Sequence, residues 1–226
     1  FDADFTIHFK ISMFFCIYIN LAVYIKMDDL ARGIRLPSVI DFKIGRITYD
    51  PEASVEKKNR QMKKYPPCEK IGFQLLGMRV FNAADKSFAH YDKVFGRSLS
   101  EQDIVHGLAL YFQFHQRPRL RAIQATIKRF ELILDWFKRQ RTYHFFSSSL
   151  IVVYEAEDDD EDDDDESNDD LDRIRVIMAD FAHVFPATDA QLDQNYIYGL
   201  ENLIVHLKQL LQPGYTFKDV RNYYAS

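Results

Sequence analysis

This chain has little of what marks a secreted, membrane-spanning or zinc-binding protein. It has two cysteines among 226 residues, Cys16 and Cys68, which give neither a disulfide framework nor paired metal-ligand spacing. Its longest apolar run, residues 11–25, has 15 residues and is interrupted by Asn20. A transmembrane helix needs roughly 20 residues, and the run also lacks the small-residue cleavage site of a signal peptide. We therefore expect one or two buried strands there, with a membrane segment as the alternative.

These absences favour an intracellular protein, in the nucleus, the cytoplasm or both, without stable membrane insertion. We also expect the natural start of the protein to lie before Phe1, because the chain does not begin with Met. The basic run 138–141 could assist nuclear import, or it could be solvated charge on a helix.

Negative charge is concentrated in one segment. Residues 155–170 hold 13 carboxylates and no basic residue, so without them the formal net charge changes from −5 to +8. Such a run cannot bury apolar surface, and we expect a disordered insert between two neighbouring strands. It lacks the spacing and central glycine of an EF-hand, so it does not predict a calcium site. The basic remainder suits a polyanion: a phosphorylated small molecule, a nucleic acid or an anionic membrane.

The rest of the chain has the composition of a folded domain, with 47% apolar and 15% aromatic residues. Its length permits one sizeable domain or two small lobes. The patterns predict strands at 22–28, 37–45, 71–81, 147–155 and 173–180, and helices at 52–64, at 101–113, from 118 onward and at 193–211. Residues between 81 and 95 read as a polar loop. Strands and helices do not alternate regularly, which favours an α+β fold.

The strand at 37–45 contains a charged pair on a rigid element. Alternation with a period of two places Val39, Asp41 and Lys43 on one face and the apolar residues between them on the other. Gly45 then lets the chain turn sharply or approach a ligand closely. A carboxylate beside an ammonium can be a structural ion pair. It can also be a site for a charged ligand.

The predicted helix 52–64 has a cationic face. At 100° per residue, Lys57, Arg60, Gln61 and Lys64 lie on one side, and apolar residues lie on the other. This face could simply be solvated. Beside a charged strand, however, convergent cations are what a multiply phosphorylated ligand requires.

A carboxylate follows directly on another apolar strand. Asp180 ends the run 173–180, and His183 lies three residues further on. A carboxylate at this position can cap a turn. It can also hold Mg²⁺, which takes few protein oxygens when nucleotide phosphates supply the others.

Together these patterns resemble the inositol polyphosphate kinase family, most closely its multikinase branch. The resemblance rests on P-x-x-x-D-x-K-x-G at 37–45, S-S-L-I at 148–151, D-F-A-H at 180–183 and Y-G-L-E-N-L-I at 198–204, and it covers roughly residues 24–211. It implies an ATP-dependent kinase that phosphorylates hydroxyls of inositol polyphosphates, such as inositol 1,4,5-trisphosphate and inositol tetrakisphosphates, with Mg²⁺.

The resemblance also implies a role for each site residue. Asp41 and Lys43 would be catalytic, and Asp41 would either orient the acceptor hydroxyl or bind the nucleotide ribose. The inositol phosphate would be bound by Lys57, Arg60, Gln61, Lys64 and His183, the nucleotide by Asp28, Leu30 and Asp41, and the metal by Asp180 and Ser149.

The fold implied by the resemblance is the C-lobe of such a kinase at 31–226, an antiparallel sheet with flanking helices. Residues 1–30 would be a remnant of the N-terminal lobe and the hinge, with that lobe largely missing or atypical. We expect inositol polyphosphates and ATP as partners of a monomer. A catalytically weak inositol phosphate-binding scaffold is the alternative. Nucleic-acid binding ranks lower, because the sequence shows no recognisable module for it.

Overall fold

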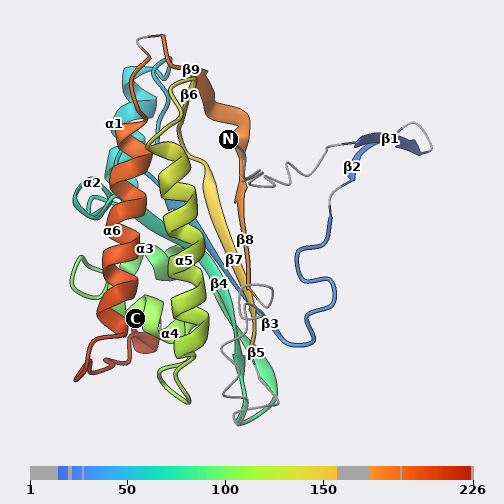
Figure 1. Cartoon of the computed structure of the whole chain (residues 1–226), viewed down its shortest axis with the longest axis vertical. Helices are drawn as coiled ribbons and strands as arrows, with labels where there is room; N and C mark the ends of the chain where they lie inside the picture. Colours follow the sequence, from blue (N-terminus) through green and yellow to red (C-terminus); the bar gives the residue numbers. More distant parts are fainter. Residues whose placement is uncertain (1–14, 20–21, 27, 157–173, 189, 225–226) are drawn as a thin grey trace, which may run out of the picture.

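The main sheet has five antiparallel strands with the Asp-Lys strand at its centre (Figure 1). The computed structural model describes residues 15–19, 22–26, 28–156, 174–188 and 190–224. The strand order is β5-β4-β3-β7-β8, and the bounds are β3 Pro37–Ile44, β4 Phe73–Asn82, β5 Ser87–Tyr91, β7 Ser149–Glu155 and β8 Ile174–Ala179. The predicted α+β class with an antiparallel sheet is confirmed.

Three helices cover the apolar face of this sheet. They are α4 (Ile104–Tyr111), α5 (Leu120–Phe137) and α6 (Gln194–Leu210), and α5 and α6 lie side by side in Figure 1. Phe42 of β3 meets Phe73 and Phe130 edge to face, with ring centroids 6.2 and 6.5 Å apart. Burying each such side chain stabilises the fold by about 1.5–3 kcal/mol. The core therefore lies between the sheet and these helices.

Strand β3 alternates as predicted. Ile40, Phe42 and Ile44 are fully buried against the helices, whereas Asp41 and Lys43 are half-buried on the opposite face. The pairing of β3 with β4 shifts register between Asp41 and Phe42. The extra residue is Leu76 of β4, and bulges of this kind are common beside functional sites.

Three glycines let α6 approach the end of β3. Gly45 has φ +111°, and a Cβ atom there would lie 2.4 Å from the side-chain nitrogen of Asn195. Its N–H donates to the carbonyl of Gly72 at 2.8 Å. A Cβ atom on Gly199 would lie 2.1 Å from that same carbonyl oxygen. Close backbone packing thus fixes the C-terminal end of β3, just after Asp41 and Lys43.

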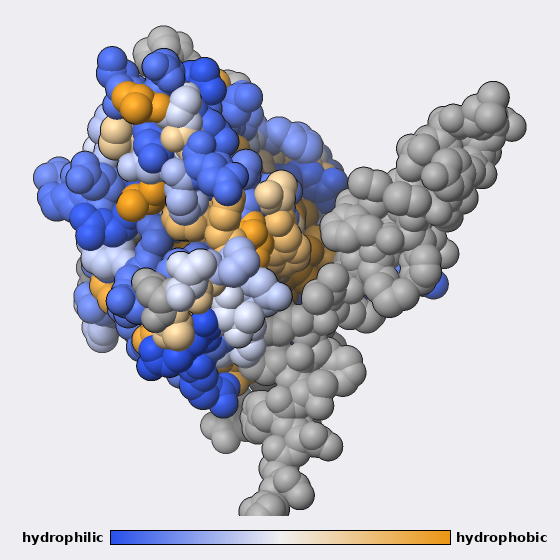
Figure 2. Space-filling view, turned by 90° about the horizontal axis from the view of Figure 1, so that it is seen from above, coloured by the Kyte–Doolittle hydropathy of each residue, from blue (hydrophilic) through white to orange (hydrophobic). Residues whose placement is uncertain are grey.

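Helix α1 (Val55–Lys64) lies at the surface and buries none of its residues. Ser54 caps it by accepting from the N–H of Lys57 at 3.2 Å, so the helix begins three residues later than predicted. Its apolar residues Val55 and Met62 are 68% and 52% exposed. Figure 2 shows hydrophobic residues scattered over a mainly hydrophilic surface. Polar contacts from its N-terminal half, Lys57 to Asp50 and Lys58 to the carbonyl of Pro51, tie α1 to the preceding loop.

The predicted polar loop before residue 95 is wrong. It contains β5 and helix α3 (Lys93–Ser98), which Asp92 caps by accepting from the N–H groups of Val94 and Phe95. Short elements were also not predicted, namely α2 (Cys68–Ile71) and the paired strands β6 (Tyr143–Phe145) and β9 (Val184–Pro186). Helix α4 begins at Ile104 rather than 101, after a turn in which Ser100 binds Asp103.

The N-terminal apolar run, for which one or two buried strands were predicted, contains two strands. β1 (Phe15–Ile19) and β2 (Ala22–Lys26) pair antiparallel and lie apart from the main sheet in Figure 1. The rest of the predicted lobe remnant before residue 28 lies outside the described residues, as do positions 157–173 of the predicted acidic insert. None of the described helices is long and apolar enough to cross a membrane.

The predicted start of the insert at 155 is two residues too early. Glu155 ends β7, and its carboxylate accepts from the N–H groups of Arg35 and Leu36, each at 2.8 Å. Ala156 is buried and donates its N–H to the carbonyl of Leu36. Glu155 thus belongs to β7, and Glu155 and Ala156 together anchor the segment that leads into β3.

Candidate active site

The structure brings four of the predicted site residues to the face of the sheet opposite the core helices. Asp41 and Lys43 project from β3, Lys43 pairs with Ser149 on β7, and Ser149 pairs with the residue before Asp180. Neighbouring strands lie about 4.8 Å apart, so the group spans roughly 10 Å. Asp180 perturbs the pKa of both Asp41 and Lys43. These side chains therefore form one electrostatic unit.

The two central charges are held in a partly desolvated place. Burial raises the pKa of Asp41, and Asp180 raises it further, while Ser149 and Lys43 oppose the shift. Burial lowers the pKa of Lys43, against the attraction of Asp180 and Asp41. Charges in such surroundings interact more strongly with a ligand than they would in water. The Lys43 ammonium also donates to the Ser147 hydroxyl at 3.3 Å.

The oxygen atoms of this unit suit a hard divalent cation. Ser149 is 1% exposed, and among the described residues its Oγ and Oδ1 of Asp41 make no hydrogen bond of good geometry, although Ser149 lies close enough to lower the pKa of Asp41. Asp180 is exposed and has left-handed backbone angles, φ 63° and ψ 64°, which are strained for a non-glycine residue. The described residues hold no cluster of three or more His, Cys, Asp or Glu. Asp41, Ser149 and Asp180 therefore offer few protein oxygens. A set of this kind suits Mg²⁺ that takes its other ligands from phosphates.

A buried carboxylate links α1 to the D-F-A-H segment. Asp50, with a side chain 6% exposed, accepts from the Lys57 ammonium at 2.8 Å and lies 3.2 Å from Nδ1 of His183. The hydrogen bond from Lys57 is the main reason that the pKa of Asp50 is lowered. Asp50 precedes the predicted helix 52–64 and was not among the predicted site residues. The sequence gives no signal for this role, because burial of Asp50 depends on tertiary packing.

Four cationic side chains lie near one another at α1 and α3, namely Lys64 and Arg60 of α1 and Arg97 and Lys93 of α3. Partial desolvation, followed by the nearby charges of Arg97, Arg60 and Lys93, lowers the pKa of Lys64. Among the described residues, none of these four side chains forms an ion pair with a carboxylate. Lys64 in turn lowers the pKa of Lys43. Uncompensated cations that already repel one another are suited to bind an anion.

Sequence reasoning missed Lys93 and Arg97. Lys93 lay in the segment that read as a polar loop, and Arg97 lay between predicted elements. The signal that could have located α3 is Asp92, a good N-cap residue, followed by an apolar pair. Nε of Arg97 is buried without a hydrogen-bond partner among the described residues.

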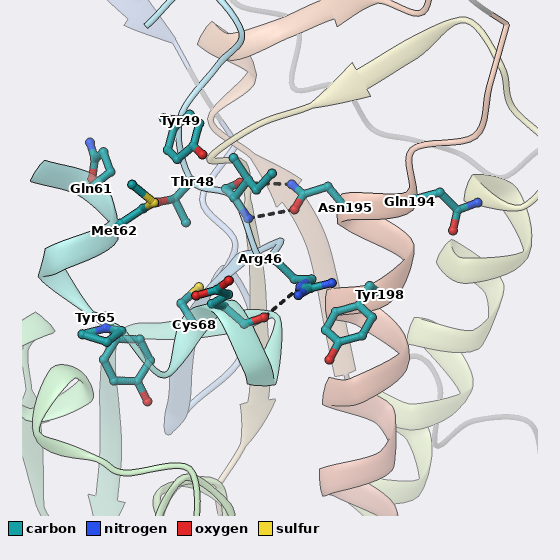
Figure 3. Close-up of a pocket in the computed structure, with 13 residues that line it drawn as sticks. Arg46, Thr48, Tyr49, Gln61, Met62, Tyr65, Cys68, Gln194, Asn195 and Tyr198 are labelled. Atoms are coloured by element: carbon teal, nitrogen blue, oxygen red, sulfur yellow. Dashed lines mark hydrogen bonds between the residues drawn. The ribbon is translucent and has the colours of Figure 1, made fainter. Parts of the chain in front are cut away.

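Gln61 faces a different space from the other predicted substrate residues. It lines a cavity of about 620 Å³ beside α1, together with Arg46, Asn195, Tyr198 and neighbouring residues (Figure 3). The Arg46 guanidinium lies 4.7 Å from the centre of the Tyr198 ring and donates to the carbonyl of Glu69 at 2.8 Å. Asn195 binds both the N–H and the carbonyl of Ile47. This cavity is not formed by the Asp41–Asp180 unit.

The predicted hinge residues precede β3. Asp28 is exposed and Leu30 is half-buried. The Leu30 carbonyl accepts from Arg175 at 2.5 Å. Arg175 lies five residues before Asp180, and β8 connects them, so at about 3.3 Å per residue the two positions are roughly 16 Å apart. Leu30, a predicted nucleotide contact, thus lies near the start of β8, and Asp180, a predicted metal ligand, follows the end of the same strand.

The antiparallel α+β fold thus brings Asp41, Lys43 and Asp180 close enough to interact. The chain belongs to the inositol polyphosphate kinase family, whose sequence model matches residues 24–208. It is 38% identical over 123 residues to inositol polyphosphate multikinase of Rattus norvegicus, covering 54% of this chain and 31% of the relative. It is 29% identical over 200 residues to inositol hexakisphosphate kinase 3 of Mus musculus, covering 83% and 50%. The chain thus spans a third to a half of the length of these curated relatives.

Solved structures share this fold. A crystal structure of inositol phosphate multikinase from S. cerevisiae, in complex with ADP and Mn²⁺, aligns with a TM-score of 0.71 at 23% identity and covers 89% of each chain. Another inositol phosphate multikinase structure aligns with a TM-score of 0.70 at 24% identity and covers 82% of this chain and 85% of its own. At these identities the likeness concerns the fold.

Proposed function

We propose that this chain transfers the γ-phosphoryl group of ATP to a hydroxyl of an inositol polyphosphate, such as inositol 1,4,5-trisphosphate or an inositol tetrakisphosphate. The observation that carries the proposal is that Asp41, Lys43, Ser149 and Asp180 meet on one face of the sheet, next to the uncompensated cations of α1 and α3. Phosphoryl transfer needs mainly positioning and charge neutralisation, and both are available here.

The nucleotide would lie along β7 and β8, on the face of the sheet that carries Lys43. Its base would be at Leu30, which is tied to Arg175, and its phosphates would reach Lys43 at the Asp180 end. Asp41 lies on the same face two residues nearer the Leu30 end. This position supports ribose binding over contact with the acceptor hydroxyl. The yeast relative that was solved with ADP and Mn²⁺ supports nucleotide use by the family.

Asp180 and Ser149 would hold Mg²⁺, which when bound neutralises and orients the nucleotide phosphates. The exposed Asp180 carboxylate is accessible to a ligand, and the buried Ser149 hydroxyl lacks another partner among the described residues. Lys43 would neutralise charge on the transferring phosphoryl group. Because Lys43 is partly desolvated, its contribution should be larger than that of a surface lysine.

The acceptor would bind on the α1 and α3 side of Lys43. Lys64, Arg60, Arg97 and Lys93 would contact its phosphate groups, because these cations converge without carboxylate partners. Lys57 and His183 would form the border of the site, with Asp50 holding both. We place this activity in an intracellular monomer, in the nucleus or the cytoplasm.

A phosphoryl-transfer assay tests the proposal. The chain is incubated with γ-labelled ATP, MgCl₂ and a panel of inositol phosphates, and the products are separated by chromatography. Label transfer to an inositol phosphate supports the kinase. The alternative is an inositol phosphate-binding scaffold, which the cations of α1 and α3 could form without a nucleotide. Calorimetry that detects inositol phosphate binding but no Mg-ATP binding would favour the scaffold and refute the kinase.

A further inference from the structure

Gln74 lies beside Lys43 on the strand next to it. In the pairing of β3 with β4, Gln74 is directly opposite Lys43. Its neighbours Phe73 and Leu75 are fully buried on the core side, so the Gln74 side chain projects from the other face, where Lys43 projects. Side chains in directly opposed positions have Cβ atoms about 5 Å apart. Gln74 is therefore a direct neighbour of Lys43.

The side-chain amide nitrogen of Gln74 is buried and has no hydrogen-bond partner among the described residues. Gln74 is 5% exposed, and its Nε2 makes no hydrogen bond among the described residues. A buried donor without a partner costs about 1–3 kcal/mol, and nearly all such groups in folded proteins are satisfied. Ser149, on the opposite side of Lys43, likewise has a buried hydroxyl that makes no hydrogen bond of good geometry among the described residues, with Asp41 as its neighbour. Lys43 thus lies between two buried polar side chains.

The surroundings favour a neutral donor at this position. Lys64 already lowers the pKa of Lys43 by repulsion, so a further cation beside Lys43 would increase the cost of keeping both charged. An amide adds an N–H donor without adding charge. Toward an anionic ligand, its hydrogen bond is assisted by the charge of the acceptor oxygen.

We propose that Nε2 of Gln74 donates a hydrogen bond to a phosphate oxygen of the ligand held by Lys43, on the side opposite Ser149 and Asp180. This inference rests on the proposed function, because it takes that ligand to be a phosphate ester. The oxygen can belong to the phosphoryl group in transfer or to a phosphate of the acceptor. The chemistry is the same in both cases, and the kinetics distinguish them.

The test compares Gln74→Leu and Gln74→Glu with the wild-type chain. Thr126→Val is the matched control, because Thr126 is also a buried polar residue, but it bonds to Ala122 within α5. Binding of Mg-ATP and of inositol 1,4,5-trisphosphate is measured by calorimetry, and turnover is measured with each substrate varied. Thermal unfolding shows whether each variant folds.

We expect Gln74→Leu to fold with an unchanged or higher melting temperature, because the unpartnered amide is gone. Affinity or kcat/KM should fall about ten- to a hundredfold, the loss of one hydrogen bond to a charged group. Gln74→Glu should be worse, because it places a carboxylate against phosphate. A loss confined to the trisphosphate assigns the oxygen to the acceptor, and a loss in kcat or in ATP binding assigns it to the transferred phosphoryl group.

The inference is overturned if Gln74→Leu binds and turns over both substrates within twofold of wild type, or if Thr126→Val loses as much as Gln74→Leu. Failure of the proposed function is seen separately, in the wild-type chain. If wild type binds the ligands without transferring phosphate, the kinase is refuted, and the binding data for Gln74→Leu still decide the role of the amide. If wild type binds neither ligand, both are refuted.

Discussion

Replacing Lys43 by Met should abolish most turnover while leaving the fold intact. Met has a similar length but no charge, so the substitution removes the ammonium that lies next to Asp41 and is attracted by Asp180. Loss of a single preorganised group that stabilises transition-state charge costs about 10²–10³ in kcat, or roughly 2.7–4 kcal/mol. We expect a loss of this size, because Lys43 is directly opposite Ser149 and interacts with Asp180, the two proposed metal ligands.

The stability effect of this substitution should be small. The pKa of Lys43 is lowered mainly by burial, so its charged form costs folding free energy at neutral pH, and Met removes that cost. What is lost is one long hydrogen bond to Ser147 and the attraction of two carboxylates. These terms oppose each other, and we expect a melting temperature within a few degrees of wild type.

The assay measures kcat for label transfer at saturating Mg-ATP and inositol 1,4,5-trisphosphate, with circular dichroism to check the fold. Lys128→Met serves as the control, because Lys128 is an exposed residue of α5 on the helical side of the sheet. A folded Lys43→Met chain that keeps turnover within about fivefold of wild type would remove Lys43 from the mechanism. An equal loss in Lys128→Met would point to a general effect of the substitution.

Three further predictions follow from the same contacts. Asp41 has a raised pKa, so at pH 7 Asp41→Asn should raise the free energy of unfolding, and this difference should disappear as the pH falls through the raised pKa toward about 4. Asp50 has a lowered pKa, so Asp50→Asn should lower the free energy of unfolding by about 1–3 kcal/mol at pH 7, and this difference should shrink only as the pH falls below about 4. Denaturant titrations check both, and equal signs at pH 7 would contradict the assignment. Gly199→Ala should destabilise the fold by several kcal/mol, because its methyl group would overlap a backbone carbonyl; an unchanged melting temperature would contradict this packing. Arg97→Ala should weaken binding of inositol 1,4,5-trisphosphate at least tenfold and reduce the salt dependence of binding, as calorimetry at two ionic strengths would show; unchanged affinity would exclude α3 from the site.

Local sequence patterns were sufficient to predict the central strand β3 and three other strands of the main sheet, β4, β7 and β8. The alternation in β3 placed Asp41 and Lys43 on the face opposite Phe42, and the structure agrees. The long helices α5 and α6 were also predictable, because their apolar residues recur at helical spacing. The prediction that Asp180 lies near Asp41 came from the family resemblance. Residue spacing could not give it, because local sequence patterns do not determine the order of strands in a sheet.

The remainder depends on tertiary contacts that no local pattern encodes. Asp50 acquires its role by being buried between Lys57 and His183, which are far apart in sequence. Gln74 stands in an apolar run, and its importance appears only when β4 is placed in register with β3. The short helix α3 was missed because one and a half turns give too little periodicity, so Lys93 and Arg97 were missed as well.

The most direct test of the central claim is a crystal structure of the chain with ADP, Mn²⁺ and inositol 1,4,5-trisphosphate. We expect the anomalous signal of Mn²⁺ next to Asp180 and Ser149, nucleotide phosphates at Lys43, and the trisphosphate on the side of Lys64 and Gln74. Ligands found in separate places, for example with the trisphosphate in the cavity between Arg46 and Tyr198, would contradict it.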